Sequence, residues 1–159
     1  MLPPSLQEAL EQARNTHQKI TLVTGVFDVL HEKHQDFLRD AKALGGFLLV
    51  GIEPDLRVKQ MKGEDRPYHP QDQRIQNLEE LGIADAVFLL PENFGQPEVR
   101  EALIKEIRPQ FLAVSSHSLY QEKKQELMNK YGGQLAVVTQ YDPQYSSTKL
   151  IQELRKSNK

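Results

Sequence analysis

The sequence predicts an α/β fold in which a doubly wound, five-stranded parallel sheet is flanked by helices. Two observations predict it. Five short apolar runs, rich in Val, Ile, Leu and Phe, have the length of buried strands. The longer stretches between them carry apolar residues every three or four positions, as one face of a helix does. Such an alternation gives β-α-β units, whose right-handed crossovers build a parallel sheet with helices on both faces.

The predicted strands are the runs Ile20–Thr24, Phe47–Gly51, Ala86–Leu90, Phe111–Val114 and Gln134–Val138. Helical faces between them are marked by Leu30, His34, Phe37, Leu38 and Ala41, by Ile75, Leu78 and Leu81, and by Val99, Leu103 and Ile107. These elements in this order predict a Rossmann-like sheet.

Helix boundaries follow from capping residues and breakers. Ser5 is expected to cap a first helix that reaches about His17, and Pro70 precedes a helix over 71–80. The pairs Gly45-Gly46 and Gly132-Gly133 are expected to end two other helices. A closing helix is expected over 146–156.

The chain has the size of one domain, with residues 1–19 as an N-terminal helix and 20–159 as the main body. The first helix is expected to serve packing or oligomer formation, so a homodimer is a possible assembly. The 159 residues include 20 Lys+Arg, 22 Asp+Glu and no Cys, for a formal charge of −2. Missing cysteines exclude disulfides, thiol nucleophiles and cysteine-held metals.

The charge balance argues against general nucleic-acid binding, which needs a basic excess to neutralise phosphates. No stretch approaches the roughly 20 apolar residues of a membrane span, and no targeting segment stands out. The expected partners are therefore small molecules rather than nucleic acid or membrane, and the expected location is cytoplasmic.

The most informative stretch follows the first predicted strand, because ligands of such sheets bind beyond the carboxyl ends of the strands. Gly25 would let phosphates approach the backbone, and the next helix would offer free N–H groups to them. His31 and His34 lie three residues apart in the expected first turn, so that two donors converge on one phosphate. The alternatives are histidines that pack or face solvent, and a metal pair, although the zinc-protease motif has a spacing of four.

Gly25-x-Phe27-Asp28-x-Leu30-His31-x-x-His34 resembles the signature of the cytidylyltransferase-like nucleotidyltransferases. Three further segments match that family in order and spacing: Gly51–Asp55 leading to Lys59, Lys62-Gly63-Glu64 and Arg66-Pro67; Arg74; and Tyr145–Ile151. Within the family, the chain resembles most the domain that adenylylates heptose 1-phosphate. It is next similar to glycerol-3-phosphate cytidylyltransferase and to archaeal-type FAD synthetase.

The resemblance implies transfer of a nucleoside monophosphate from ATP or CTP to a sugar phosphate, a polyol phosphate or FMN. Pyrophosphate leaves, and Mg²⁺ accompanies the nucleotide without a metal site of the protein's own. By motif position the catalytic residues are His31, His34, Lys59 and Lys62. The nucleotide-binding residues are Thr24, Gly25, Val26, Phe27, Arg74, Ser146, Ser147 and Thr148. Acceptor binding is assigned to Asp28, Asp55 and His117, and Asp28 alternatively orients its loop.

The same resemblance assigns contacts to phosphate groups. His34 would contact the α-phosphate and His31 the neighbouring phosphates, while Lys59, Lys62 and Arg74 would hold the β and γ groups or the acceptor phosphate. Each residue also has a plainer interpretation. The lysines, expected on a loop, would be solvated charges, Arg74 a surface charge, and Ser147 and Thr148 helix caps.

Three departures from the family pattern bear on activity and substrate. Lys33 stands where the family has Gly, and the segment 115–120 replaces a Lys-Gly-Gly-Asp stretch of the heptose branch. Tyr141 stands where the glycerol-phosphate enzymes carry Arg, which weakens that assignment. Two alternatives therefore stay open: a catalytically impaired descendant that binds a nucleotide or partner, and a structural subunit that assembles through its first helix.

Overall fold

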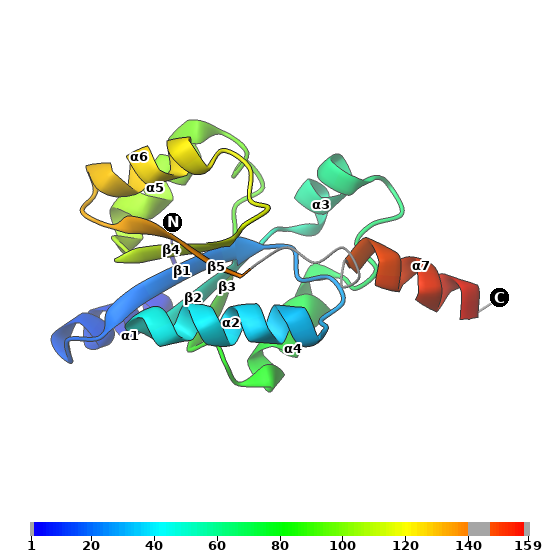
Figure 1. The fold of residues 1–159 in the computed structure, drawn as a ribbon, viewed down its shortest axis with the longest axis horizontal. Coiled ribbons are helices and arrows are strands. Elements are labelled where there is room, and N and C mark those ends of the chain that lie inside the picture. Colours follow the sequence, from blue (N-terminus) through cyan, green and yellow to red (C-terminus); the bar gives the residue numbers. More distant parts are fainter. Residues whose placement is uncertain (1, 140–146, 158–159) are drawn as a thin grey trace.

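The computed structural model describes residues 2–139 and 147–157 and forms one five-stranded parallel sheet wrapped by helices (Figure 1). The strands are β1 (Lys19–Gly25), β2 (Gly46–Ile52), β3 (Ala86–Leu89), β4 (Phe111–Ser115) and β5 (Gln134–Thr139). The helices are α1 (Pro4–Asn15), α2 (Glu32–Gly45), α3 (Asp55–Lys62), α4 (Gln71–Leu81), α5 (Pro97–Ile107), α6 (Gln121–Lys130) and α7 (Ser147–Ser157). The predicted α/β class and all five strands are confirmed, with ends shifted by one residue at most.

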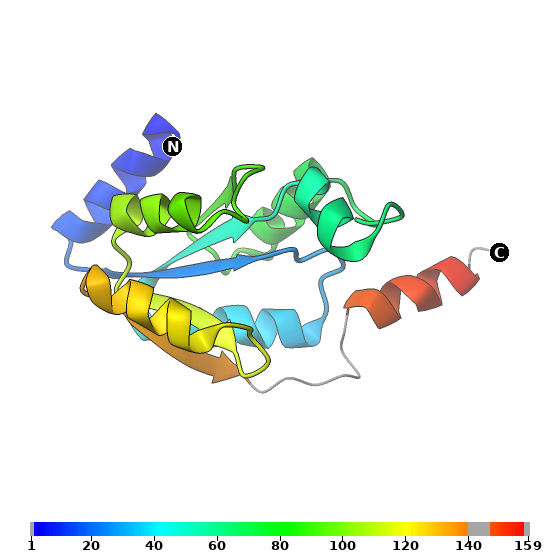
Figure 2. The same cartoon turned by 90° about the horizontal axis from the view of Figure 1, so that it is seen from above.

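Two apolar layers hold the helices on opposite faces of the sheet (Figures 1 and 2). One layer joins side chains of α1, α5 and α6 to the sheet, among them Leu10, Leu103 and Met128. The other joins α2 and α4 to it through Leu38, Ala41 and Leu78. Successive strand residues alternate between the layers, because side chains of a strand point to opposite faces.

The strand order is β3-β2-β1-β4-β5, so the chain reverses its winding between β1 and β4. β1 pairs with β2 along seven residues, from Lys19–Gly46 to Gly25–Ile52. It pairs with β4 only at Thr21–Phe111 and Leu22–Leu112. The carboxyl halves of β1 and β4 are therefore not paired, and a crevice at this reversal is where such sheets bind ligands.

The first helix begins differently from the prediction and is part of the core. Pro3 is its N-cap and Pro4 its first residue, so Ser5 lies inside the helix and makes no side-chain cap hydrogen bond. Proline is favoured there because the first helical N–H groups lack a partner in any case. Leu6 and Leu10 lie in the same apolar layer as α5, and Arg14 donates a hydrogen bond to the carbonyl of Ile107. The helix is therefore a packing element of the domain.

The short helix α3 was predicted as a loop, because its residues show no apolar periodicity. It carries one buried side chain, Val58, and Gly63 follows it with a φ of 112°. A left-handed residue at this point is favourable only for glycine and ends the helix. Within the described residues, no helix is both long and apolar enough to cross a membrane.

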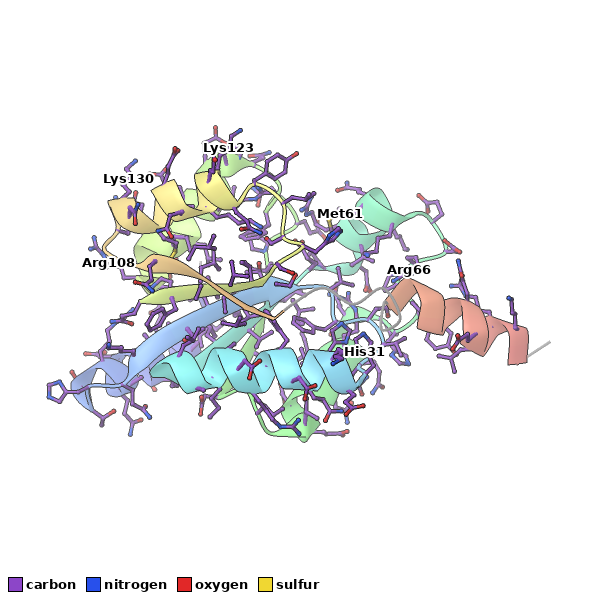
Figure 3. The ribbon with its side chains drawn as sticks, viewed as in Figure 1. His31, Met61, Arg66, Arg108, Lys123 and Lys130 are labelled. Carbon is purple, nitrogen blue, oxygen red and sulfur yellow. The ribbon has the colours of Figure 1, made fainter. Side chains whose placement is uncertain are left out.

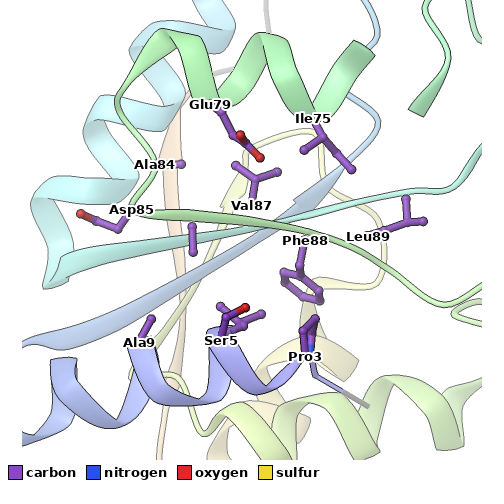
Figure 4. A pocket seen from close by; sticks show the side chains of 12 residues that line it. Pro3, Ser5, Ala9, Ile75, Glu79, Ala84, Asp85, Val87, Phe88 and Leu89 are labelled. Carbon is purple, nitrogen blue, oxygen red and sulfur yellow. The ribbon is translucent and has the colours of Figure 1, made fainter. Parts of the chain in front are cut away.

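A cavity of about 520 Å³ lies along the edge strand β3, between α1 and α4. Figure 4 shows Val87 facing Ile75 of α4, and Phe88 facing Pro3 at the start of α1. None of the described side chains that line this cavity is a predicted site residue. The cavity is therefore separate from the carboxyl ends of β1 and β4.

Candidate active site

The loop from β1 to α2 brings the two motif histidines together at the carboxyl edge of the sheet. Their rings stack with centroids 3.7 Å apart and an angle of 18° between the planes. His31 is the N-cap of α2, and its Nδ1 accepts a hydrogen bond of 3.4 Å from the backbone N–H of His34. The predicted convergence of the two rings at the start of a helix is thus present, with His31 one residue before the first turn.

The environment keeps both imidazoles neutral near pH 7. Burial lowers the pKa of His31. Burial, reinforced by the charge of His31, lowers the pKa of His34 to about 4, and the backbone of Val29 opposes that shift. The Nδ1 atom of His34 is buried without a hydrogen-bond partner. A buried polar atom of this kind points to a group that arrives from outside the chain.

Gly25 leaves room for a neighbouring side chain, while the predicted approach of phosphates to its backbone stays a prediction. A Cβ built on Gly25 would lie 2.9 Å from Cε2 of Phe27, so the space beside Gly25 is filled by that ring. Phe27 has a φ of 49° and is buried, and its ring packs edge-on to His34 at 5.4 Å between centroids. Gly25 therefore leaves space for the Phe27 ring, which packs against His34. Thr24 and Val26, on either side of Gly25, are half-buried.

Asp28 is buried and organises the loop between α3 and α4. Its Oδ2 accepts hydrogen bonds from Nε of Arg66 at 3.2 Å and from the backbone N–H of Tyr68 at 2.8 Å. Its Oδ1 accepts one from the backbone N–H of His69 at 2.8 Å. The side chain is 0% exposed, and both carboxylate oxygens accept hydrogen bonds from this loop, while acceptor binding by Asp28 stays a prediction.

The alternative interpretation of Arg74 as a surface charge is wrong, since its side chain is 0% exposed, while nucleotide binding by Arg74 stays a prediction. Its Nε donates to the carbonyl of His69, its Nη1 to the carbonyls of Val26 and Glu53, and its Nη2 forms an ion pair with Asp55 at 2.8 Å. One guanidinium thus fixes the loops that follow β1, β2 and α3. A buried guanidinium needs such complete pairing, because an unpaired charge in the core is costly.

The two motif lysines lie on α3 and not on a loop. Lys59 and Lys62 are both exposed, and Lys62 ends the helix. Desolvation and the nearby charge of Arg66 lower the pKa of Lys62, while the carboxylate of Asp28 opposes that shift. Because both charges act on it, the Lys62 ammonium lies close to the ion pair of Arg66 and Asp28. Figure 3 shows His31 and Arg66 at the same end of the molecule.

The remaining predicted residues are spread around this edge. Asp55 is held by Arg74, with 33% of its side chain exposed. His117 is exposed in the loop after β4. Ser147 and Thr148 begin α7, although their side chains lie outside the described part of the chain, as does Ser146 altogether. Direct contacts of these residues with nucleotide or acceptor stay predictions.

Three residues of the site had no predicted role. Glu53, directly after β2, pairs with Arg57 of α3 at 3.2 Å, and this ion pair fixes the helix that carries both lysines. Arg66 pairs with Asp28, and Nδ1 of His69 lies 2.9 Å from the carbonyl oxygen of Asp28. The available signal was the Arg66-Pro67 dipeptide in the family motif, which marked the segment but not its inward-facing side chains.

Acidic side chains of the site do not form a metal cage. Among the described residues, no group of three His, Asp or Glu side chains is arranged to hold a metal ion. Asp28, Glu53 and Asp55 are each paired with an arginine.

A family model described as cytidylyltransferase-like matches residues 22–153. The chain is 34% identical over 152 residues to the Bifunctional protein HldE of Pseudomonas fluorescens, covering 95% of this chain and 31% of that protein. The protein of the same name from Pseudomonas paraeruginosa is 31% identical over 148 residues, covering 92% of this chain and 30% of its own length. The chain thus spans just under a third of these curated relatives.

Solved structures agree with the sequence relatives. The lipopolysaccharide core biosynthesis protein from Thermoplasma volcanium has a TM-score of 0.65 and 26% identity, covering 79% of this chain and 99% of that one. Pantothenate synthetase from Thermus thermophilus, at 14% identity and a TM-score of 0.55, covers 93% and 68% and shares the fold alone. The matched family model, the relatives and the histidine motif together show that the chain belongs to the cytidylyltransferase-like family of nucleotidyltransferases.

Proposed function

We propose that the protein transfers a nucleoside monophosphate from ATP or CTP to a phosphorylated small molecule and releases pyrophosphate. The observation that carries this proposal is the stacked pair of His31 and His34, with the buried Nδ1 of His34 lacking a partner. In such a reaction an acceptor phosphate oxygen attacks the α-phosphorus, so the protein contributes positioning and charge stabilisation and no nucleophile.

The lowered pKa of His34 gives the pair a specific role. Two charged imidazoles at 3.7 Å would repel each other, so the rings stay neutral until a polyanion arrives. Phosphate charge beside His34 favours the protonated ring, whose N–H groups are then donors for the oxygens of the α-phosphate. His34 thus gains its charge where negative charge develops in the transition state.

Cations on α3 complete the arrangement. Lys59 and Lys62 are exposed and long enough to follow phosphates that change position during transfer. Mg²⁺, if it enters with the nucleotide, would neutralise the β- and γ-phosphates as pyrophosphate leaves. Asp55, the first residue of α3, is partly exposed and is the carboxylate that would help to hold this ion.

A sugar phosphate is the acceptor class we favour. Support comes from the resemblance to the heptose 1-phosphate adenylyltransferase domain, and from relatives whose names place one of them in lipopolysaccharide core biosynthesis. The end of β4 and the loop after it, with Ser115 and His117, differ from the Lys-Gly-Gly-Asp stretch of the heptose branch. We therefore assign the choice among sugar phosphates to this loop.

The test measures pyrophosphate release with ATP and with CTP, each with Mg²⁺ and a panel of sugar phosphates, polyol phosphates and FMN. We expect turnover with one nucleotide and one acceptor class. His34→Ala should lower kcat by about 100- to 1000-fold, the usual cost of removing one donor to a developing charge. His17→Asn, at an exposed turn outside the site, is the matched control and should leave turnover unchanged.

Nucleotide binding without pyrophosphate release by the natural protein would contradict this function and favour the impaired descendant. In that case the Lys33→Gly variant is informative, since it restores the family residue between the two histidines. A gain of turnover in Lys33→Gly would identify Lys33 as the cause of the loss.

A further inference from the structure

The last helix touches the domain through one face. Among the α7 side chains that the structure describes, only Ile151 and Arg155 are not exposed. They lie four residues apart and therefore on the same side of the helix. Ile151 is 1% exposed, while α7 projects away from the sheet at the carboxyl edge (Figures 1 and 2).

Arg155 binds the loop between α3 and α4 through two nitrogens. Its Nη1 lies 2.7 Å from Oδ2 of Asp65, and its Nη2 donates to the carbonyl of the same residue at 2.6 Å. This forked contact fixes the orientation of the guanidinium as well as its distance. The hydrogen bond from Arg155 lowers the pKa of Asp65, so the carboxylate is charged throughout the neutral range.

Asp65 also connects α7 to the centre of the site. Its chain neighbour Arg66 points inward to the buried carboxylate of Asp28, which organises the same loop. Lys62, three residues before Asp65, ends the helix that carries the motif lysines. The Asp65–Arg155 pair, the outer ion pair, therefore attaches α7 to the loop between α3 and α4. The Arg66–Asp28 pair, the inner ion pair, fixes the same loop beside the loop that carries the histidines.

We propose that Arg155 and Asp65 are positioning residues, which hold α7 so that its start at Ser147 lies beside the phosphate site. This inference rests on the proposed function, because the start of α7 matters to catalysis only if a nucleotide binds there. Helix starts favour phosphate through their free N–H groups. Among the side chains described on α7 only Ile151 is buried, and the ion pair at Arg155 adds a directional contact that restrains rotation of the helix.

The kinetic test compares Arg155→Ala with Lys156→Ala, which removes the same charge from the neighbouring exposed position. Arg155→Ala should raise KM for the nucleotide about two- to fivefold, the range of one partly exposed ion pair, with kcat nearly unchanged. Lys156→Ala should leave both constants unchanged. Equal KM values for the two variants would overturn the inference.

Charge exchange separates positioning from a general loss of structure. Asp65→Arg combined with Arg155→Asp should recover part of the lost affinity, since the side-chain pair is restored while the bond to the carbonyl of residue 65 is not. Amide hydrogen exchange over residues 151–157 should rise in Arg155→Ala and fall again in the double variant. Unchanged amide exchange in Arg155→Ala would overturn the positioning role, whether or not the natural protein shows turnover. Absence of turnover in the natural protein would by itself contradict only the proposed function.

Discussion

Asp65 and Arg66 are neighbours in the chain, yet their ion pairs lie in opposite environments. Arg66 pairs inward with Asp28, and the two side chains are 6% and 0% exposed. Asp65 pairs outward with Arg155, and these side chains are 71% and 38% exposed. A buried charge depends on its partner because water cannot replace it, whereas an exposed charge is solvated either way. The inner pair should therefore govern stability and the outer pair the position of a helix.

The largest effect is expected for the inner pair. Asp28→Ala leaves Arg66 buried without its carboxylate, and also two backbone N–H groups without an acceptor. Breaking a buried pair in this way costs about 3–5 kcal/mol of unfolding free energy. Urea denaturation of the natural protein and the variant measures the loss. Asp28→Asn, which keeps one acceptor oxygen, should lie between them, and a loss as small as that of Asp65→Ala would contradict the comparison.

The histidine pair extends the comparison to pH. The pKa of His34 is about 4 in the folded chain, below its usual 6.5. The contribution of neutral His34 to the free energy of unfolding is complete above pH 6.5. It falls as the pH drops from 6.5 toward 4, because in this range only the unfolded chain takes up the proton. The slope from this group is at most about 1.4 kcal/mol per pH unit. His34→Gln should reduce the slope in urea denaturation between pH 7 and pH 4.5. An unchanged slope would show that His34 is not held neutral.

The next effect in size is expected from the packing between Gly25 and the Phe27 ring. Gly25→Ala places a methyl group 2.9 Å from the Phe27 ring, which must then move away from His34. Overpacking of this kind costs about 1–3 kcal/mol, measured by thermal or urea denaturation. If crowding is the cause, adding Phe27→Leu should recover part of the loss. A double variant less stable than the sum of both changes would exclude that cause.

The smallest effect on stability is expected for the outer pair. Asp65→Ala should leave the denaturation midpoint unchanged within error, because both side chains become solvated. Raising the salt concentration should also leave the stability difference from the natural protein near zero. A loss comparable to that of Asp28→Ala would show that the outer pair is as important for stability as the inner pair, which contradicts the comparison.

Much of the fold followed from local pattern. All five strands were predicted because a buried parallel strand is a continuous apolar run, and its length limits where it can end. The helix α3 was missed because it buries only Val58, which leaves no apolar periodicity to detect. The cap at Ser5 was wrong because the consecutive prolines 3 and 4 already fix the helix start.

For the site, sequence identified the loop and the histidines but not how they are supported. One stretch of ten residues contains Gly25, Phe27, His31 and His34, so the local sequence is enough to predict that they lie together. The partners of Arg74 are spread from Val26 to His69, and no spacing rule connects them. Hence the sequence predicted Arg74 as a nucleotide contact, with a surface charge as the alternative, and gave no sign that its side chain is fully buried.

The sequence by itself determined the α/β sheet, the phosphate-type motif after its first strand and the family to which the chain belongs. Tertiary structure decided which charges face inward. Asp28 and Arg66 are 38 residues apart, and Asp65 and Arg155 are 90 apart. Local pattern records which residues are charged, while the free energy of each charge depends on desolvation and on partners that only folding brings together.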